Sequence, residues 1–182
     1  MALLARWNRR GLVFGGIASC VVAVAGPAWA RASLGGEGSA FALNGVPPGT
    51  IVISQSRRRL YLTQPDGTAI SYPVAIGRGG KAWSGWARIE GKHVRPAWSP
   101  PAEVKRDNPR LPQVIPGGAP NNPMGARALT LDRSEIAIHG TSASMRASIG
   151  SAASYGCIRM LNEDVIDLFD RVAIGTRVFS AP

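Results

Sequence analysis

A cysteine between a glycine and an isoleucine-arginine pair is the part of this chain best suited to chemistry. Cys157 lies within residues 154–160, which read Ser-Tyr-Gly-Cys-Ile-Arg-Met, and His139 precedes it by eighteen positions. A thiol and an imidazole that meet in a fold can act as a nucleophile and its general base. An isolated cysteine is more often a small buried apolar residue. In an extended segment, however, Cys157 shares a face with Arg159, which would be unusual in a core and favours an active site.

His139 ends a short apolar run in which Ile136 and Ile138 alternate with it. Because successive strand residues point to opposite faces, His139 points away from those isoleucines. An isolated histidine at a strand end is usually structural. Here the Ser-, Ala- and Gly-rich residues 141–153 can carry the chain back and lay Cys157 beside His139. We therefore expect the two side chains to meet at the rim of a sheet.

The first thirty residues have the pattern of a secretory signal peptide. Three arginines lie near the start, residues 11–25 form an apolar run too short for a membrane span, and residues 28–30 read Ala-Trp-Ala. The length of 182 residues suits one domain behind such a segment. We expect a signal peptide over 1–30, a flexible linker over 31–49 and one domain over 50–182, exported to the periplasm or cell envelope.

Cys20 follows the triplet Ile-Ala-Ser, which resembles the lipid-attachment motif of lipoproteins. The residues after it, 21–25, are still apolar, and this favours soluble export. Lipidation of Cys20 stays open as the one predicted route to a membrane. Removal of residues 1–30 leaves Cys157 as the only cysteine, so no intrachain disulfide is expected.

The basic charge of the chain points to an acidic partner. The formal net charge is +10, and without the three arginines of the signal it is 10 − 3 = +7. The cations are scattered and no nucleic-acid motif is present, so we expect an anionic envelope polymer as the partner and no nucleic acid. Two distant histidines and one thiol make no ligand set, so neither a metal nor another cofactor is predicted.

The pattern of elements predicts a mostly β protein. Strands are expected over residues 51–54, 60–63, 69–76, 86–94, 128–131, 136–138 and 176–179. The second and third of these are joined by the turn Pro65-Asp66-Gly67, which predicts a hairpin. Helices do not alternate with strands, which favours a closed or sandwiched sheet over a parallel α/β sheet.

One helix and one long loop complete the prediction. Residues 163–172 carry apolar side chains at helical spacing, with Asn162 as the expected N-cap. Residues 96–125 hold eight of the fourteen prolines and cannot form a regular ladder. Long ordered loops of this kind are often lids or cleft walls, and Trp98 is the candidate wall residue in this one.

These motifs resemble the catalytic domain of the L,D-transpeptidases, the YkuD-type family. The resemblance rests on Ile-His-Gly-Thr at 138–141 and Ser-x-Gly-Cys-Ile-Arg-Met at 154–160, and it extends from about Thr50 to Phe179. It implies that residues 50–182 are the catalytic domain, with a β-sandwich fold and one clear helix after the cysteine. It also implies a cysteine enzyme that forms an acyl-thioester on a peptidoglycan stem tetrapeptide.

The resemblance also implies a role for each matching residue. Cys157 would be the nucleophile, His139 its base, and the Gly140 carbonyl would orient the imidazole. Backbone N–H groups of Gly156 and Cys157 would hold the oxyanion. The residues expected to contact substrate are Arg159, Tyr155, Ser154 and Trp98.

Two departures from the family pattern leave other functions open. Tyr155 stands where the family usually has a histidine, and residues 82–86 differ from the usual Thr-Pro-x-Gly segment. A non-catalytic peptidoglycan-binding module on the same fold is therefore an alternative. The acyl acceptor is also open: a second stem gives a cross-link, water gives L,D-carboxypeptidase activity, and a lysine of an envelope protein gives anchoring.

Overall fold

The computed structural model describes Leu43 and residues 45–182. The predicted signal peptide and Cys20 lie outside these residues, as does most of the predicted linker. Within the described part of the chain, no helix is long and apolar enough to cross a membrane.

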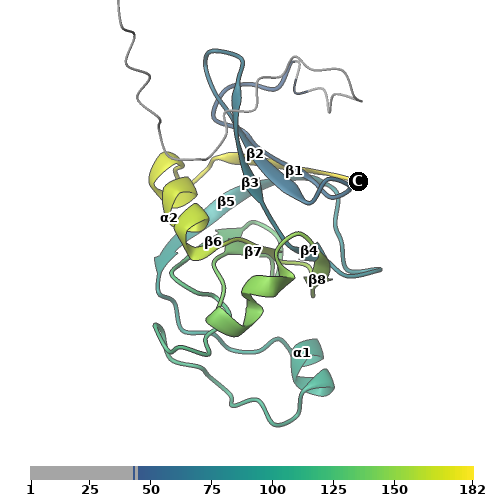
Figure 1. Ribbon diagram of the computed structural model, residues 1–182, viewed down its shortest axis with the longest axis vertical. Coiled ribbons are helices and arrows are strands. Elements are labelled where there is room, and N and C mark those ends of the chain that lie inside the picture. The colour runs from purple at the N-terminus through teal and green to yellow at the C-terminus, as the bar shows by residue number, and fades with distance from the viewer. Residues whose placement is uncertain (1–42, 44) are drawn as a thin grey trace, which may run out of the picture.

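A curled, mixed sheet of eight strands forms the body of the domain (Figure 1). Across the sheet, the strands are β3 (Ala69–Pro73), β2 (Arg59–Thr63), β1 (Ile51–Ser54), β10 (Arg177–Ala181), β5 (Gly85–Val94), β6 (Arg127–Leu131), β7 (Ala137–His139) and β9 (Ile158–Arg159). Neighbours are antiparallel except for β1–β10 and β7–β9. Two further strands, β4 (Ile76–Gly77) and β8 (Ala152–Ser154), pair in parallel as a small second sheet. The predicted mostly β class is confirmed.

The predicted hairpin is the β2–β3 pair. Its turn is closed by Asp66, whose Oδ1 accepts hydrogen bonds from the N–H and the hydroxyl of Thr68 at 3.0 and 2.6 Å. Gly67 adopts a φ of 76°, a conformation that glycine reaches at little cost. The sequence therefore determines this turn locally.

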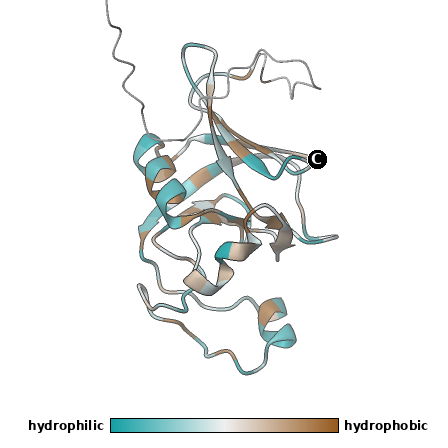
Figure 2. Ribbon diagram, viewed as in Figure 1, coloured by the Kyte–Doolittle hydropathy of each residue, from teal (hydrophilic) through white to brown (hydrophobic). Residues whose placement is uncertain are grey.

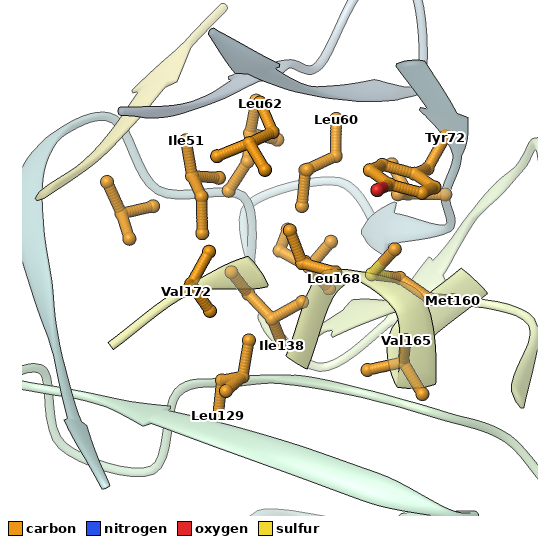
Figure 3. Close-up of a cluster of buried hydrophobic side chains, with 14 of the residues drawn as sticks. Ile51, Leu60, Leu62, Tyr72, Leu129, Ile138, Met160, Val165, Leu168 and Val172 are labelled. Atoms are coloured by element: carbon orange, nitrogen blue, oxygen red, sulfur yellow. The ribbon is translucent and has the colours of Figure 1, made fainter. Parts of the chain in front are cut away.

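The predicted helix is α2 (Asn162–Arg171), and it packs on one face of the sheet (Figure 1). Val165 and Leu168 of α2 point into the core (Figure 3). Figure 2 shows hydrophilic residues on the outward turns of α2. The expected N-cap is wrong: Leu161 occupies that position, no side chain caps the helix, and Asn162 uses its amide elsewhere.

Apolar side chains fill both faces of the sheet around β1, all four residues of which are buried. Ile51 and Ile53 face α2, whereas Val52 faces the opposite side with Tyr61 and Leu43. Each fully buried side chain of this size contributes roughly 1.5–3 kcal/mol relative to an exposed one. The larger cluster includes Ile51, Ile53, Leu60, Leu62, Tyr72, Ile138, Ile158, Met160, Val165, Leu168 and Val172.

The proline-rich segment 96–125 is mostly loop, as its composition predicts, with one short helix, α1 (Ala102–Asp107). It closes on itself through two backbone hydrogen bonds between Trp98 and Ile115, of 2.9 and 2.8 Å. The Asn122 amide adds hydrogen bonds to the carbonyls of Pro96 and Pro116, each of 2.9 Å. A second helical segment that the sequence did not predict is a 3-10 helix at Ala143–Ser148.

Candidate active site

The parallel pairing of β7 with β9 places the candidate catalytic side chains on one face. Ile138 lies opposite Ile158, and His139 lies opposite Arg159. Both isoleucines point into the core and are almost fully buried; Figure 3 shows Ile138 there. Cys157, two residues before Arg159, therefore shares the other face with Arg159 and His139.

The Cys157 thiol is protonated in this arrangement. It donates a hydrogen bond to the Glu135 carbonyl, with an Sγ–O distance of 3.3 Å. Burial raises the pKa of the thiol, while a backbone hydrogen bond with Ala137 and the charge of Arg159 act in the opposite direction. Glu135 has a φ of 59°, unusual for a residue with a side chain, and this turn geometry presents its carbonyl to Cys157.

His139 is held as a neutral imidazole with a defined tautomer. Its side chain is buried, and Nδ1 lies 2.8 Å from the Gly140 carbonyl oxygen. A carbonyl can only accept, so Nδ1 carries the hydrogen and Nε2 is the basic nitrogen. Burial, and then the charge of Arg159, lower the pKa of His139 to about 4, although the carbonyls of Gly140 and Pro123 favour the protonated ring and oppose this. The expected Gly140 contact is present.

The thiol lies where two cavities meet. Cys157, Trp98 and Met124 line both a cavity of about 500 Å³ and one of about 630 Å³. The larger also contains His139 and Arg159. Both volumes fall within the range of ligand sites. The thiol hydrogen is directed at the Glu135 carbonyl rather than at the imidazole, so it must turn away from Glu135 before His139 can accept the proton.

The turn before Cys157 is built by Ser154. Its hydroxyl donates to the Cys157 carbonyl at 2.6 Å and accepts from the Gly156 N–H at 3.0 Å. The structure thus gives Ser154, which is buried, a role in shaping the turn. It also corrects one expectation: the Gly156 N–H is engaged by Ser154, which leaves the Cys157 N–H as the candidate oxyanion donor.

Tyr155 connects the cysteine turn to the proline-rich loop. Its hydroxyl donates to Asp107 of α1 at 2.6 Å, and the Arg78 guanidinium contacts the same carboxylate oxygen at 2.8 Å. Arg78 also stacks on the Tyr155 ring, 4.0 Å from its centroid. We call this group of three side chains the Tyr155 latch. Because Trp98 belongs to the loop that the latch holds, the shape of both cavities depends on it.

The family model for the L,D-transpeptidase catalytic domain, YkuD, matches residues 48–179. This chain belongs to the YkuD family. The probable L,D-transpeptidase YbiS of Escherichia coli is 40% identical over 141 residues, which cover 73% of this chain and 44% of that protein. The putative L,D-transpeptidase YkuD of Bacillus licheniformis is 34% identical over 137 residues, covering 74% of this chain and 67% of the relative.

Solved structures of L,D-transpeptidases share the fold. An L,D-transpeptidase from Mycobacterium smegmatis superposes with a TM-score of 0.58 at 13% identity, over 73% of this chain and 58% of that one. L,D-transpeptidase 3 from Mycobacterium tuberculosis superposes with a TM-score of 0.58 at 15% identity, over 75% of this chain and 62% of that one. At this identity the likeness establishes the fold alone. This chain spans less than half the length of YbiS and of the similar E. coli protein ErfK/SrfK.

Within the YkuD fold, the structure gathers the predicted residues Cys157, His139, Arg159, Tyr155 and Trp98 around the larger cavity. Further contributors were not apparent from the sequence: the carbonyls of Glu135 and Pro123, the carboxylate of Asp107, and the amide of Asn162. Carbonyls carry no sequence signal, and Asp107 and Asn162 reach the site only through the fold. Among the described residues, no three His, Cys, Asp or Glu side chains could together hold a metal ion.

Proposed function

We propose that this domain is a peptidoglycan L,D-transpeptidase in which Cys157 is the nucleophile and His139 the general base. The observation that supports it best is that the two side chains share one face and one cavity in a YkuD-family domain, at the junction of a second cavity. A transferase needs room for an acyl donor and for an acyl acceptor, and two cavities that share a thiol supply that room.

In the first half-reaction, the thiol rotates from Glu135 toward His139 and gives its proton to Nε2 as Sγ attacks the carbonyl of the L-to-D bond of a stem tetrapeptide. A C–S bond forms, and the tetrahedral intermediate is held by the Cys157 N–H. The C–N bond then breaks, the imidazolium protonates the leaving amine, and terminal D-alanine departs. The product is an acyl-thioester.

In the second half-reaction, a side-chain amine of another stem attacks the thioester and gives a proton to His139. The C–S bond breaks, the thiolate takes that proton back, and a cross-link remains. The pKa values of Cys157 and His139 disfavour a preformed thiolate–imidazolium pair, so proton transfer accompanies attack. The Gly140 carbonyl stabilises the imidazolium while it exists.

Arg159 is proposed to bind a carboxylate of the stem. Its side chain is half-buried in the larger cavity, and no ion pair involves it within the described part of the chain. A partly desolvated cation with no carboxylate beside it favours an anionic ligand. Trp98 and Tyr155 are the proposed walls of that cavity. The acceptor remains a proposal as well: a second stem, water, or a lysine of an envelope protein.

The proposed location is the periplasm or cell envelope, which rests on the signal-like residues 1–30 and on the predicted substrate. The net charge of +7 that remains without those residues would attract an acidic wall polymer.

A non-catalytic peptidoglycan-binding module is the second candidate. It is favoured by the protonated thiol, by its hydrogen bond to Glu135 rather than to His139, and by Tyr155 in place of the family histidine.

Mass spectrometry of purified muropeptides incubated with the protein separates these functions. We expect cross-linked dimers and free D-alanine, both abolished in Cys157→Ala. Tripeptide without dimer would indicate a carboxypeptidase. Muropeptide binding with no product, unchanged in Cys157→Ala, would refute the transpeptidase and support the binding module.

A further inference from the structure

We propose that Asn162 is a positioning residue that holds His139 in its active tautomer and orientation; this inference rests on the proposed function of His139 as a base. Asn162 is the first residue of α2 and makes no helix cap. Its Oδ1 accepts hydrogen bonds from the N–H groups of Ala126 and Thr141, at 2.9 and 3.1 Å. Its Nδ2 donates to the Thr141 carbonyl at 2.9 Å. One amide thus joins three backbone groups on two separate segments.

One of those backbone groups belongs to the peptide that orients the imidazole. The Thr141 N–H and the Gly140 carbonyl are the two ends of a single planar peptide unit. Asn162 holds the N–H end, and the carbonyl end accepts from His139 Nδ1 at 2.8 Å. If this peptide plane turned, both hydrogen bonds would be lost. Asn162 therefore fixes the direction of the acceptor that determines which ring nitrogen carries the proton.

Asn162 also anchors a second segment, the one that carries Pro123. Its Oδ1 holds the Ala126 N–H, three residues after Pro123, whose carbonyl favours the protonated form of the imidazole. The amide thus tethers the segment that accepts from Nδ1 and the segment whose carbonyl favours the imidazolium. Linked hydrogen bonds of this kind polarise one another, so the amide also strengthens the Gly140 carbonyl as an acceptor.

Two glycines leave the space that the amide occupies. A Cβ on Gly125 would lie 2.3 Å from Asn162 Oδ1, and a Cβ on Gly140 would lie 2.2 Å from the same atom. Both distances are shorter than any real carbon–oxygen contact. The His-Gly pair of the catalytic motif is therefore explained in part by Asn162: residue 140 must be glycine so that the amide can reach the peptide beside His139.

The test compares Asn162→Ala and Asn162→Asp with a control, Thr63→Val. The alanine variant removes all three hydrogen bonds, whereas the aspartate variant keeps the shape and the acceptor but turns a carboxylate oxygen toward the Thr141 carbonyl. Thr63 makes a similar set of contacts far from the site, with the Thr50 N–H and the carbonyls of Pro47 and Thr50. Loss of stability alone is thus measured by the control.

Two readouts distinguish positioning from a merely structural role. The first is the tautomer of His139, read from its ring ¹⁵N chemical shifts. The second is D-alanine release from a stem tetrapeptide, with kcat and KM separated. We expect Asn162→Ala to lose the pure Nδ1–H signature and to lower kcat about 10- to 100-fold, the range for loss of the hydrogen-bond partners that orient metal-bound histidines, with KM nearly unchanged. Asn162→Asp, which keeps the acceptor of the Thr141 N–H but repels the Thr141 carbonyl, should show smaller changes in the same direction. Thr63→Val should alter neither.

Wild-type tautomer and kcat in both Asn162 variants would overturn the proposal. If Asn162→Ala does not fold, the smaller changes expected for Asn162→Asp supply the comparison. The tautomer readout needs no turnover: a wild-type protein that is inactive on stem peptides, but whose tautomer depends on Asn162, would refute the proposed function and still support the positioning role. A wild-type protein that is fully active on stem peptides, but whose His139 tautomer does not depend on Asn162, would support the proposed function and refute the positioning role.

Discussion

His139 should make the folded domain sensitive to acid, because its imidazole must stay neutral where it is buried. The unfolded chain protonates this residue near its ordinary pKa of 6.5, whereas the folded protein does so only near 4. Below pH 6.5 the unfolded state therefore binds a proton that the folded state does not. Stability falls as the pH drops through this window and levels off below the folded pKa.

The size of the effect follows from the shift. The difference between the pKa of 6.5 in the unfolded chain and about 4 in the folded protein corresponds to about 3 kcal/mol of unfolding free energy in total. By pH 5, where the folded ring is still mostly neutral, the loss should already be about 2 kcal/mol. The measurement is urea denaturation at pH 8, 6.5, 5 and 4 of the wild type and of His139→Asn. Asparagine cannot titrate, and its amide can still donate to the Gly140 carbonyl.

The difference between the two pH profiles isolates His139 from other titrating groups. Asp164 in particular has a pKa raised by burial to about 6, so it acts in the opposite direction and favours the folded state at low pH. Its contribution is present in both proteins and cancels. If the two profiles stay parallel from pH 8 to pH 4, or if the His139 ring protons titrate near pH 6.5 in the folded protein, the neutral buried imidazole is refuted.

Three further predictions follow from the same contacts. The rate at which iodoacetamide alkylates Cys157 should rise about tenfold per pH unit between pH 6 and 9, because a thiol with a pKa raised above 9.0 is less than about 1% thiolate at pH 7. A rate that is already constant near pH 6 would instead show a thiolate–imidazolium pair. Tyr155→Phe should speed amide hydrogen exchange in α1 and leave exchange in β7 unchanged, since it removes the hydrogen bond from the Tyr155 hydroxyl to Asp107 while Arg78 keeps its own contact with that carboxylate. Equal protection in both proteins would show that this hydroxyl does not hold the loop. Gly156→Ala should lower the unfolding free energy by about 1–3 kcal/mol, because φ is 128° and the new Cβ would lie 2.9 Å from Ile136 Cδ1. The matched control is Gly67→Ala, which should be less destabilising: φ is also positive at Gly67, but no atom lies within 4 Å of the new Cβ.

The sequence predicts those parts of the fold whose cause is local. The β2–β3 hairpin follows from a Pro-Asp-Gly turn between alternating strands, and α2 follows from apolar residues at helical spacing. The common face of Cys157 and Arg159 follows from strand alternation, whereas its meeting with His139 depends on the pairing of β7 with β9. Pairings that join distant segments were not predictable. The strands β8 and β9, of three and two residues, exist only because β4 and β7 lie beside them.

The candidate site shows the same division. Sequence motifs indicate the side chains with reactive atoms, and the proposed roles of Cys157 and His139 rest on them. The groups that control those atoms are different in kind. The thiol is held by a backbone carbonyl of Glu135 in a strained turn, and backbone carbonyls look alike in any sequence. The local sequence predicts Asn162 to be a helix cap, because an asparagine before two acidic residues usually caps a helix. In the structure it binds two backbone segments instead.

The incorrect N-cap has a physical explanation that links fold and chemistry. A capping Asn162 would satisfy N–H groups at the start of α2, which water can reach on this half-exposed turn. The Ala126 and Thr141 N–H groups instead lie between two tightly packed backbone segments, where an unpaired donor costs more. The amide therefore contributes more to stability by joining those segments than by capping the helix. One of those segments also orients His139. The hydrogen bonds through which Asn162 contributes most to stability therefore also set the geometry of the proposed base.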